Sequence, residues 1–162
     1  MTRCNPYIPA SAFAGHQDCI DSANAVPAPP AQVAQRATLV VTRLAPGVGA
    51  LVVADIFKRC RQRHARLAVT GTILFDGERL GALFCGAAKQ VGAAIEAIEA
   101  DTRLVSLQAL VDSHQVPPWA AQTWHAGWCE PDALAPLTEA DALQGIAAFE
   151  AWRALMAASD LL

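Results

Sequence analysis

The feature that most constrains the fold is a pair of apolar runs joined by Asp76-Gly77. The runs cover residues 66–77 and 78–86 and are rich in Leu, Ile, Phe, Val and Thr. An Asp-Gly pair between two such runs favours the tight turn of a β-hairpin. The chain is therefore predicted to contain an antiparallel strand pair near its middle, and its other elements must pack around this pair.

The segments on either side of the hairpin alternate between strand and helix patterns. Residues 37–44 form a short β-branched run, and residues 49–65 carry apolar side chains at helical spacing, with basic residues in the last turns. After the hairpin, residues 87–101 show helical spacing again, and strands are predicted over residues 103–113 and within residues 117–128. This order predicts an α+β fold, a ferredoxin-like βαββαββ sheet with two helices on one face.

A further helix is predicted over residues 137–158. Thr138 is placed to cap this helix, and Asp141 falls in its first turn, where a carboxylate is favoured. The apolar stripe of the helix is predicted to pack on the free face of the sheet or against a second copy of the protein. The helix would form a C-terminal extension of the fold.

The chain is predicted to have three parts: a proline-rich, extended tail over residues 1–36, a domain over residues 37–130, and a helical cap over residues 131–162. Over half of its 162 residues are hydrophobic, which is enough to bury a core. The net charge of −3 does not indicate a nucleic-acid binder. No apolar run is long enough for a membrane span or a signal peptide, and the five cysteines form no paired motif. We expect a cytoplasmic protein with reduced thiols.

Several side chains near the end of the first predicted helix could bind a ligand, and each has an ordinary structural alternative. His64 could donate to a carbonyl of a planar ligand, or could only complement the helix dipole. Cys60 lies four residues before His64, so the two side chains share a helix face and could supply half of the ligands of a metal site. No second pair of Cys or His residues with such spacing follows, and no metal is expected. Five basic residues between Lys58 and Arg66 could hold the phosphates of a dinucleotide, face an acidic partner, or remain solvated.

The tryptophans and two of the cysteines also have alternative interpretations. Any of the four tryptophans could take part in signalling or could only pack in the core; they are Trp119, Trp124, Trp128 and Trp152. Cys85 and Cys129 could be redox-active or could be inert buried thiols. The sequence contains no nucleophile–base constellation and no phosphate-binding glycine loop, so no catalytic residue is assigned and the chain is not expected to be an enzyme.

Three motifs resemble those of the BLUF family, the flavin-based sensors of blue light. HARLAVTGTILFDGERL (64–80) resembles the family's helix end, Thr-Gly strand and turn, and IEADTR (98–103) resembles the end of its second helix. WHAGW (124–128) resembles its fifth-strand Trp-x-Met-Gly-aromatic motif. The resemblance runs from about residue 37 to residue 130. It implies a sensory protein that holds FAD between its two helices, acts on a downstream signalling protein and forms homo-oligomers.

The resemblance also implies which residues would contact FAD: Arg63, His64, Thr70, Ala82, Asp101, Arg103, Trp124 and Ala126. In the family, a Tyr on the first strand and a Gln on the third form a hydrogen-bonded chain to the flavin. An Asn at the end of the first helix binds the ring carbonyl, and a Met on the fifth strand closes the pocket. At these four positions this chain has Val40 or Val41, Ala82, His64 and Ala126, respectively. Its one Tyr and both of its Asn residues lie in the predicted tail. Valine has no proton to give, so the family's relay is predicted to be absent.

Two functions remain open at this stage. The chain is either a blue-light sensor that binds FAD, or a flavin-free scaffold that binds a protein or another small molecule. In the second case the pocket would be apolar, and the residues that line it would be Val40 or Val41, Ile56, Ala68, Ala82 and Ala126. The space left by the small side chains would be filled by a neighbouring side chain, by the last helix, by the N-terminal tail or by an apolar ligand.

Overall fold

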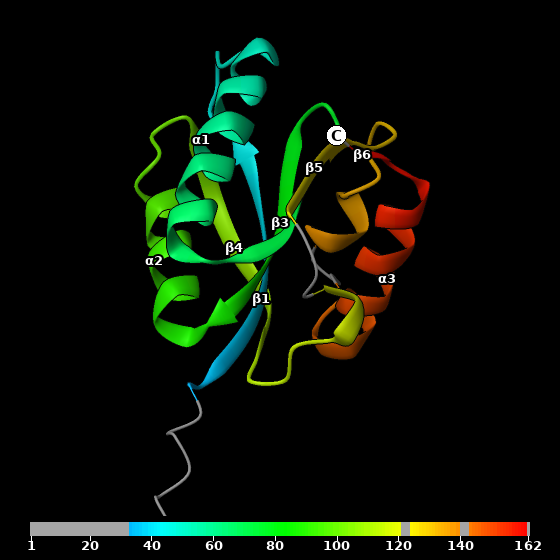
Figure 1. Ribbon diagram of the computed structural model, residues 1–162. Coiled ribbons are helices and arrows are strands. Elements are labelled where there is room, and N and C mark those ends of the chain that lie inside the picture. The colour runs from blue at the N-terminus through cyan, green and yellow to red at the C-terminus, as the bar shows by residue number, and fades with distance from the viewer. Residues whose placement is uncertain (1–32, 121–123, 140–142, 162) are drawn as a thin grey trace, which may run out of the picture. The chain divides into compact units, whose positions relative to one another are not determined.

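The computed structural model describes residues 33–120, 124–139 and 143–161 (Figure 1). The elements follow in the order β1 (Gln35–Leu44), α1 (Leu51–Leu67), β2 (Thr70–Phe75), β3 (Arg79–Ala87), α2 (Ala88–Glu99), β4 (Leu104–Ser113), η1 (Pro118–Ala120), β5 (Trp124–Trp128), η2 (Ala135–Leu137), α3 (Gly145–Ala158) and β6 (Asp160–Leu161). Here η1 and η2 are single 3-10 turns. The predicted order is confirmed from β1 to β5. Residues 1–32 of the predicted N-terminal tail lie outside the described residues, and its last two residues, Gln35 and Arg36, belong to β1, so the first strand begins two residues earlier than predicted.

The strands of the described residues form one six-stranded sheet, in the order β4-β1-β3-β2-β5-β6. The hairpin between β2 and β3 is confirmed, but its turn is centred one residue later than the sequence predicts. The N–H of Asp76 donates to the carbonyl of Arg79, and Gly77 takes the positive φ of 100°. The Asp76 carboxylate accepts from the N–H groups of Glu78 and Arg79, which fixes this register of the turn.

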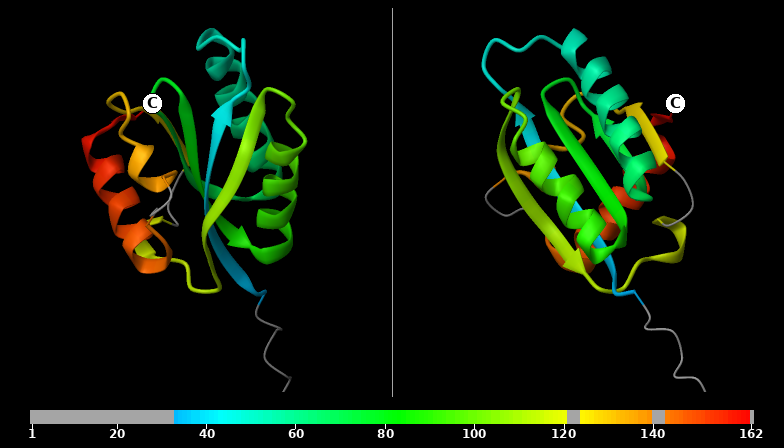
Figure 2. Two further views of the ribbon diagram at one scale, coloured as in Figure 1. Left: turned by 180° about the vertical axis from the view of Figure 1, so that it is seen from behind. Right: turned by 60° about the vertical axis from the view of Figure 1, so that its left-hand side comes forward.

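Two layers of helix cover the two faces of the sheet (Figures 1 and 2). Helices α1 and α2 pack on one face, and α3 packs on the other with the 3-10 turn at Ala135–Leu137. This confirms the ferredoxin-like α+β fold with a C-terminal helix on the free face. Strand residues alternate between the two cores, because successive side chains point to opposite faces of a sheet.

The C-terminal helix begins at Gly145, so the prediction that it starts at residue 137 is wrong. Leu134 and Leu137 are both fully buried in the core under α3, and the segment that holds them forms a 3-10 turn over Ala135–Leu137 that does not continue as an α-helix. Thr138 does not cap α3: its hydroxyl donates back to the carbonyl of Ala135 at 3.1 Å. Asp141 lies outside the described residues.

Close packing joins α3 to the middle of β3. Trp152 is fully buried, and a Cβ added at Gly81 would come within 2.5 Å of its indole ring. Glycine at this position therefore lets the helix approach the strand. Within the described residues, no helix is long and apolar enough to cross a membrane.

Candidate functional site

A row of small aliphatic side chains crosses the sheet beneath α1 and α2. The strand register pairs Val40 with Ala82, Ala82 with Ile73, and Ile73 with Ala126. All four belong to the core that faces these helices, and all are buried. The register therefore brings three of the predicted site positions, on β1, β3 and β5, into one line.

The same register shows which of the two candidates, Val40 or Val41, faces the candidate site and so corresponds to the family's Tyr. Val40 lies opposite Ala82 on the helix-covered face, whereas Val41 belongs to the core under α3. Val41 therefore does not line the candidate site. Ala68, also proposed for the apolar lining, is the exposed C-cap of α1, with a left-handed φ of 52°, and it does not line the site either.

Side chains of the two helices cover this row. Ile56, Phe57 and Cys60 of α1 and Val91 and Ile98 of α2 belong to the same core cluster, and Ala82 is completely buried. Helix α3 lies on the opposite face, so the idea that it fills the space over the row is wrong. No residue of the row has a side chain that donates or accepts a hydrogen bond.

A groove of about 580 Å³ opens beside the covered row. Its lining comes from α1, from the end of α2 and from the turn into β4: Ile56, Arg59, Cys60, Arg63, Ala97, Ile98, Ala100, Asp101, Thr102, Arg103 and Leu104. The groove is thus apolar where it meets the core and carries three arginines. Its volume lies in the range of small-molecule and cofactor pockets. None of the four row residues lines it.

An ion network spans the groove and joins α1 to the turn before β4. Arg103 donates from Nη1 to Asp55 Oδ2 and from Nε to Asp101 Oδ1, each at 2.7 Å. Arg59 also donates to Asp55, at 2.7 Å. Hydrogen bonds from Arg103 are the main cause of the lowered pKa values of both carboxylates. Arg63 makes no hydrogen bond or ion pair with any described residue, so it is the unpaired cation of the groove.

His64 lies inside the protein, in the last turn of α1. Its ring packs edge-on against Phe84 of β3 and Trp124 of β5, with ring centroids 4.9 and 4.4 Å apart. Phe84 and Trp124 each lie two residues along their strands from Ala82 and Ala126, so the three rings continue the face that carries the row. Burial, and secondarily the charge of Arg63, lowers the pKa of His64 to about 4, so the imidazole is neutral at pH 7.

Three buried nitrogens of this aromatic cluster have unused hydrogen-bonding capacity. Neither ring nitrogen of His64 nor Trp124 Nε1 has a hydrogen-bond partner among the residues that the structure describes. Buried polar groups are normally paired, so such groups indicate a site where a ligand can bind. The predicted contact at Thr70 differs, because its hydroxyl donates to the carbonyl of Cys85 across the hairpin at 3.3 Å.

The suggested half-site for a metal, Cys60 and His64, has little basis in the structure. Burial raises the pKa of the Cys60 thiol to about 11, so the thiolate that a metal requires is disfavoured. Among the described residues, no group of three His, Cys, Asp or Glu side chains could hold a metal ion.

Sequence reasoning missed two members of the site, Asp55 and Phe84. The spacing of Asp55 and Arg59, four residues apart on one helix face, indicates the first ion pair. The bond from Arg103 to Asp55 joins residues 48 positions apart and has no local signal in the sequence. Phe84 was predicted only as a strand residue, and its contact with His64 depends on how α1 packs on the sheet.

Comparison with known proteins agrees with this architecture. The family model described as BLUF, sensors of blue-light using FAD, matches residues 39–125, which is more than half of the chain. Among curated protein sequences, none matches this chain.

Solved structures of the same fold include three that illustrate its range. The dark state of BlrB, a BLUF protein, is 20% identical with a TM-score of 0.60 and covers 76% of this chain and 96% of its own. BlsA in its photo-activated state is 11% identical with a TM-score of 0.62, covering 75% of this chain and 94% of its own. The Klebsiella pneumoniae BlrP1 complex with calcium and cyclic diGMP is 15% identical with a TM-score of 0.54; it covers 78% of this chain, which spans 29% of BlrP1.

Proposed function

This chain belongs to the BLUF family, the sensors of blue light using FAD, and we propose that it is a sensory member whose flavin site has lost the family's Tyr–Gln relay. The observation that carries the proposal is the row formed by Val40, Ala82, Ile73 and Ala126. It occupies the face on which the family places its relay, and it contains no group that can donate or accept a proton.

The residues at the groove suit FAD. The apolar lining from Ile56, Cys60 and Ile98 would stack on a planar ring. The nitrogens of His64 and Trp124 lie in the buried aromatic cluster and not in the groove lining, and they would reach ring carbonyls or nitrogens only of a flavin that enters the core beside them. Arg63, which has no ion pair with the residues that the structure describes, provides a cation for a diphosphate. When bound, FAD would supply the absorption of blue light and the capacity to accept an electron.

The loss of the relay should weaken binding as well as change the light response. A ring carbonyl that is buried without a partner costs about 1–3 kcal/mol. Two or three such losses add to about 2–9 kcal/mol, which corresponds to an affinity lower on the order of 10¹–10⁶-fold. His64 is the residue that would offset part of this loss, since a neutral imidazole carries one donor and one acceptor.

A second candidate function is a flavin-free scaffold that binds a protein or another small molecule. It is favoured by one observation: side chains of α1 and α2 already cover the row, and none of the four row residues lines the groove. A scaffold of this kind would keep the fold and the C-terminal cap and would not need the photocycle.

The remaining features of the proposal concern the whole chain. We propose an N-terminal tail, a sensory domain up to residue 130 and a cap over 131–162, with the boundary between tail and domain moved from residue 37 to residue 35, where β1 begins. We further propose that the protein forms a homo-oligomer, acts on an unidentified signalling protein and catalyses no reaction itself. A cytoplasmic location is supported by the free thiols of Cys60, Cys85 and Cys129, which suit a reducing compartment. The net charge of −3 argues against nucleic acid as the partner.

The test is to express the full chain with excess FAD and to record its visible spectrum in the dark and after blue light. The proposal expects bound flavin without the red shift of the family's photocycle. It also expects His64→Ala and Arg63→Ala to lower flavin occupancy, while Arg61→Ala, on the exposed side of α1, leaves it unchanged. A red-shifted light state would contradict the loss of the relay, and a folded, colourless protein would favour the flavin-free scaffold.

A further inference from the structure

We propose that two copies of this chain meet through the outer face of α1 and α2, with cations of one copy on carboxylates of the other. The residues that carry this charge are Lys58, Arg61 and Arg66 of α1 and Glu96 and Glu99 of α2, and we call these five residues the charged face. None of them lines the groove. The inference rests on the homo-oligomer proposed above, for which it names the interface, and it does not depend on whether flavin binds.

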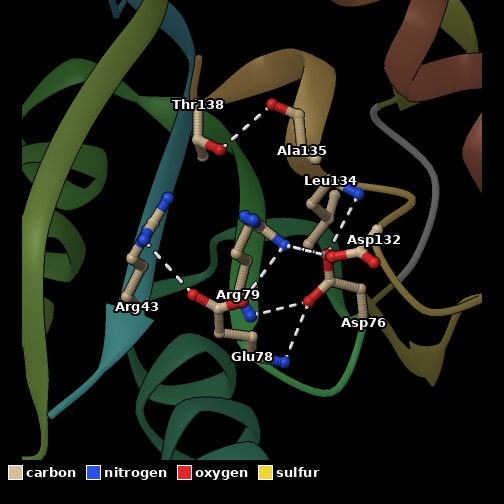
Figure 3. Close-up of polar contacts among 8 residues, drawn as sticks. All are labelled: Arg43, Asp76, Glu78, Arg79, Asp132, Leu134, Ala135 and Thr138. Atoms are coloured by element: carbon tan, nitrogen blue, oxygen red, sulfur yellow. Dashed lines mark hydrogen bonds and ion pairs between the residues drawn. The ribbon is translucent and has the colours of Figure 1, made fainter. Parts of the chain in front are cut away.

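The cations of the charged face lack partners within the chain. Among the described residues, every arginine outside α1 forms an ion pair with a carboxylate, as Arg79 does with Asp132 (Figure 3). On α1, by contrast, the exposed side chains of Lys58, Arg61 and Arg66 form no ion pair or hydrogen bond with any described residue. The helix dipole accounts for Arg66 in the last turn, but Lys58 and Arg61 lie before that turn.

Helix α2 carries the opposite charge on its exposed side. Glu96 and Glu99 lie three residues apart, so they share one helix face, and both are exposed. Neither carboxylate forms an ion pair with another residue that the structure describes. The one cation of the helix, Lys89, lies in its first turn, at the other end. The second half of α2 therefore presents negative charge to solvent.

The two helices stand next to each other on one face of the sheet (Figure 2). They run in opposite directions, because β1 and β2 both pair antiparallel with β3, and β3 and β4 both pair antiparallel with β1. The groove between them is lined by residues 56–63 of α1 and by Ala97, Ile98 and Ala100 at the end of α2. The end of α2 thus lies beside the part of α1 where the free cations begin.

This arrangement of charge is complementary to itself. A two-fold axis that runs between α1 and α2, along the helices, would place α1 of one copy on α2 of the other. In such an isologous contact each interaction occurs twice, so cations meet carboxylates in both halves of the interface. A second copy therefore supplies the partners that both sets of side chains lack in one chain.

The same pattern argues against a wide polyanion as the occupant. A nucleic acid or an anionic membrane that reached the cations of α1 would also approach Glu96 and Glu99 on the neighbouring helix, and these carboxylates would repel it. A second copy avoids this repulsion because it presents positive charge where α2 is negative. Exposed ion pairs are individually weak and are screened by salt, so the dimer should dissociate as the salt concentration rises.

The test is sedimentation of the full chain over a range of protein and salt concentrations. Lys58→Glu combined with Arg61→Glu makes the charged face mainly acidic, and Glu96→Lys combined with Glu99→Lys makes it basic. Each double variant should raise the dissociation constant of the dimer at least about tenfold, because like charges then face each other. Arg153→Glu makes the same kind of change on the exposed side of α3, on the opposite face of the sheet, and should leave the constant unchanged.

An equimolar mixture of the acidic and the basic variant should associate again, since their faces are then oppositely charged. Circular dichroism shows whether each variant is folded, and recovery in the mixture cannot come from misfolded chains. If the full chain self-associates and the double variants do so equally well, this interface is wrong while the homo-oligomer stands. A full chain that stays monomeric in low salt would overturn both, and binding of polyglutamate by that monomer would assign the cations to an acidic partner instead.

Discussion

His64 is a buried base surrounded by aromatic rings, and its titration should be visible in the stability of the protein. Its pKa is lowered to about 4 in the folded chain, from an ordinary value of 6.5. Between these two values the unfolded chain binds a proton that the folded chain does not, so the free energy of unfolding rises with pH across this window. Stability is therefore lost as the pH falls from about 6.5 towards 4.

We expect this loss to be on the order of 3 kcal/mol, because each unit of pKa difference corresponds to about 1.4 kcal/mol. The measurement is denaturant unfolding at pH values from 7.5 to 4. His64→Gln should flatten the slope in this window. The carboxylates with lowered pKa values, Asp55, Asp101 and Asp112, contribute mainly below their ordinary value of 3.8. An equal slope in His64→Gln would show that another group is responsible.

Ala82 tests whether space remains under the helices at the family's Gln position. The residue is completely buried beneath α1 and α2. Ala82→Gln, in protein free of flavin, should lower the free energy of unfolding by about 1–3 kcal/mol, because the larger amide is forced into a packed core. Ala54→Gln, on the exposed side of α1, should change it by less than about 0.5 kcal/mol. Equal tolerance of both substitutions in chemical denaturation would reveal an empty cavity at the row.

At the scale of the element, α3 packs on the sheet through the buried side chains of Ala148, Phe149 and Trp152, of which Trp152 is the largest. Trp152 is fully buried against Gly81, whereas Ile146 on the same helix is 81% exposed. Trp152→Ala should cost about 3–5 kcal/mol in the free energy of unfolding. Ile146→Ala should cost less than about 0.5 kcal/mol. Urea denaturation of the two variants checks this, and similar costs would mean that α3 is held in some other way.

The helices on the opposite face are attached differently. Ion pairs join helix α1 to the turn before β4, because Arg103 in that turn donates hydrogen bonds to Asp55 of α1 and to Asp101. These side chains are partly exposed, so the network orients the groove more than it stabilises the fold. The apolar contacts of Ile56 and Phe57 hold the helix on the sheet.

At the scale of the whole molecule, the sheet is covered on both faces, and neither cover is dispensable. Ending the chain after Glu130 would remove α3 and the 3-10 turn before it, and would expose Leu39, Val41, Leu74 and Leu83 to water. An apolar sheet face of this kind promotes association. We expect the shortened chain to elute as aggregates in size-exclusion chromatography under conditions where the full chain does not. A monodisperse shortened chain with unchanged melting temperature would show that the cap is not needed to cover the sheet.

The sequence predicted the order of elements because each element leaves a local pattern. The apolar runs around Asp76-Gly77 indicate a hairpin, and the 3.6-residue spacing over residues 87–101 indicates α2. The start of α3 was misplaced because the pattern from residue 137 onward is also compatible with a helix. In the structure, Leu137 ends a 3-10 turn that buries it in the core under α3, and the helix begins only at Gly145.

The sequence alone indicated the fold class, because local periodicity marks each element, and its motifs indicated the family by resemblance; the absence of a Tyr–Gln relay stays a prediction from the residue types present. Only the tertiary structure showed that Val40, not Val41, faces Ala82, because strand alternation fixes two faces but not which of them the helices cover. It also decided the burial of His64 and the bonds from Asp55 to Arg103 and from Asp76 to Leu134. These contacts join residues dozens of positions apart, and their distances depend on how whole elements pack.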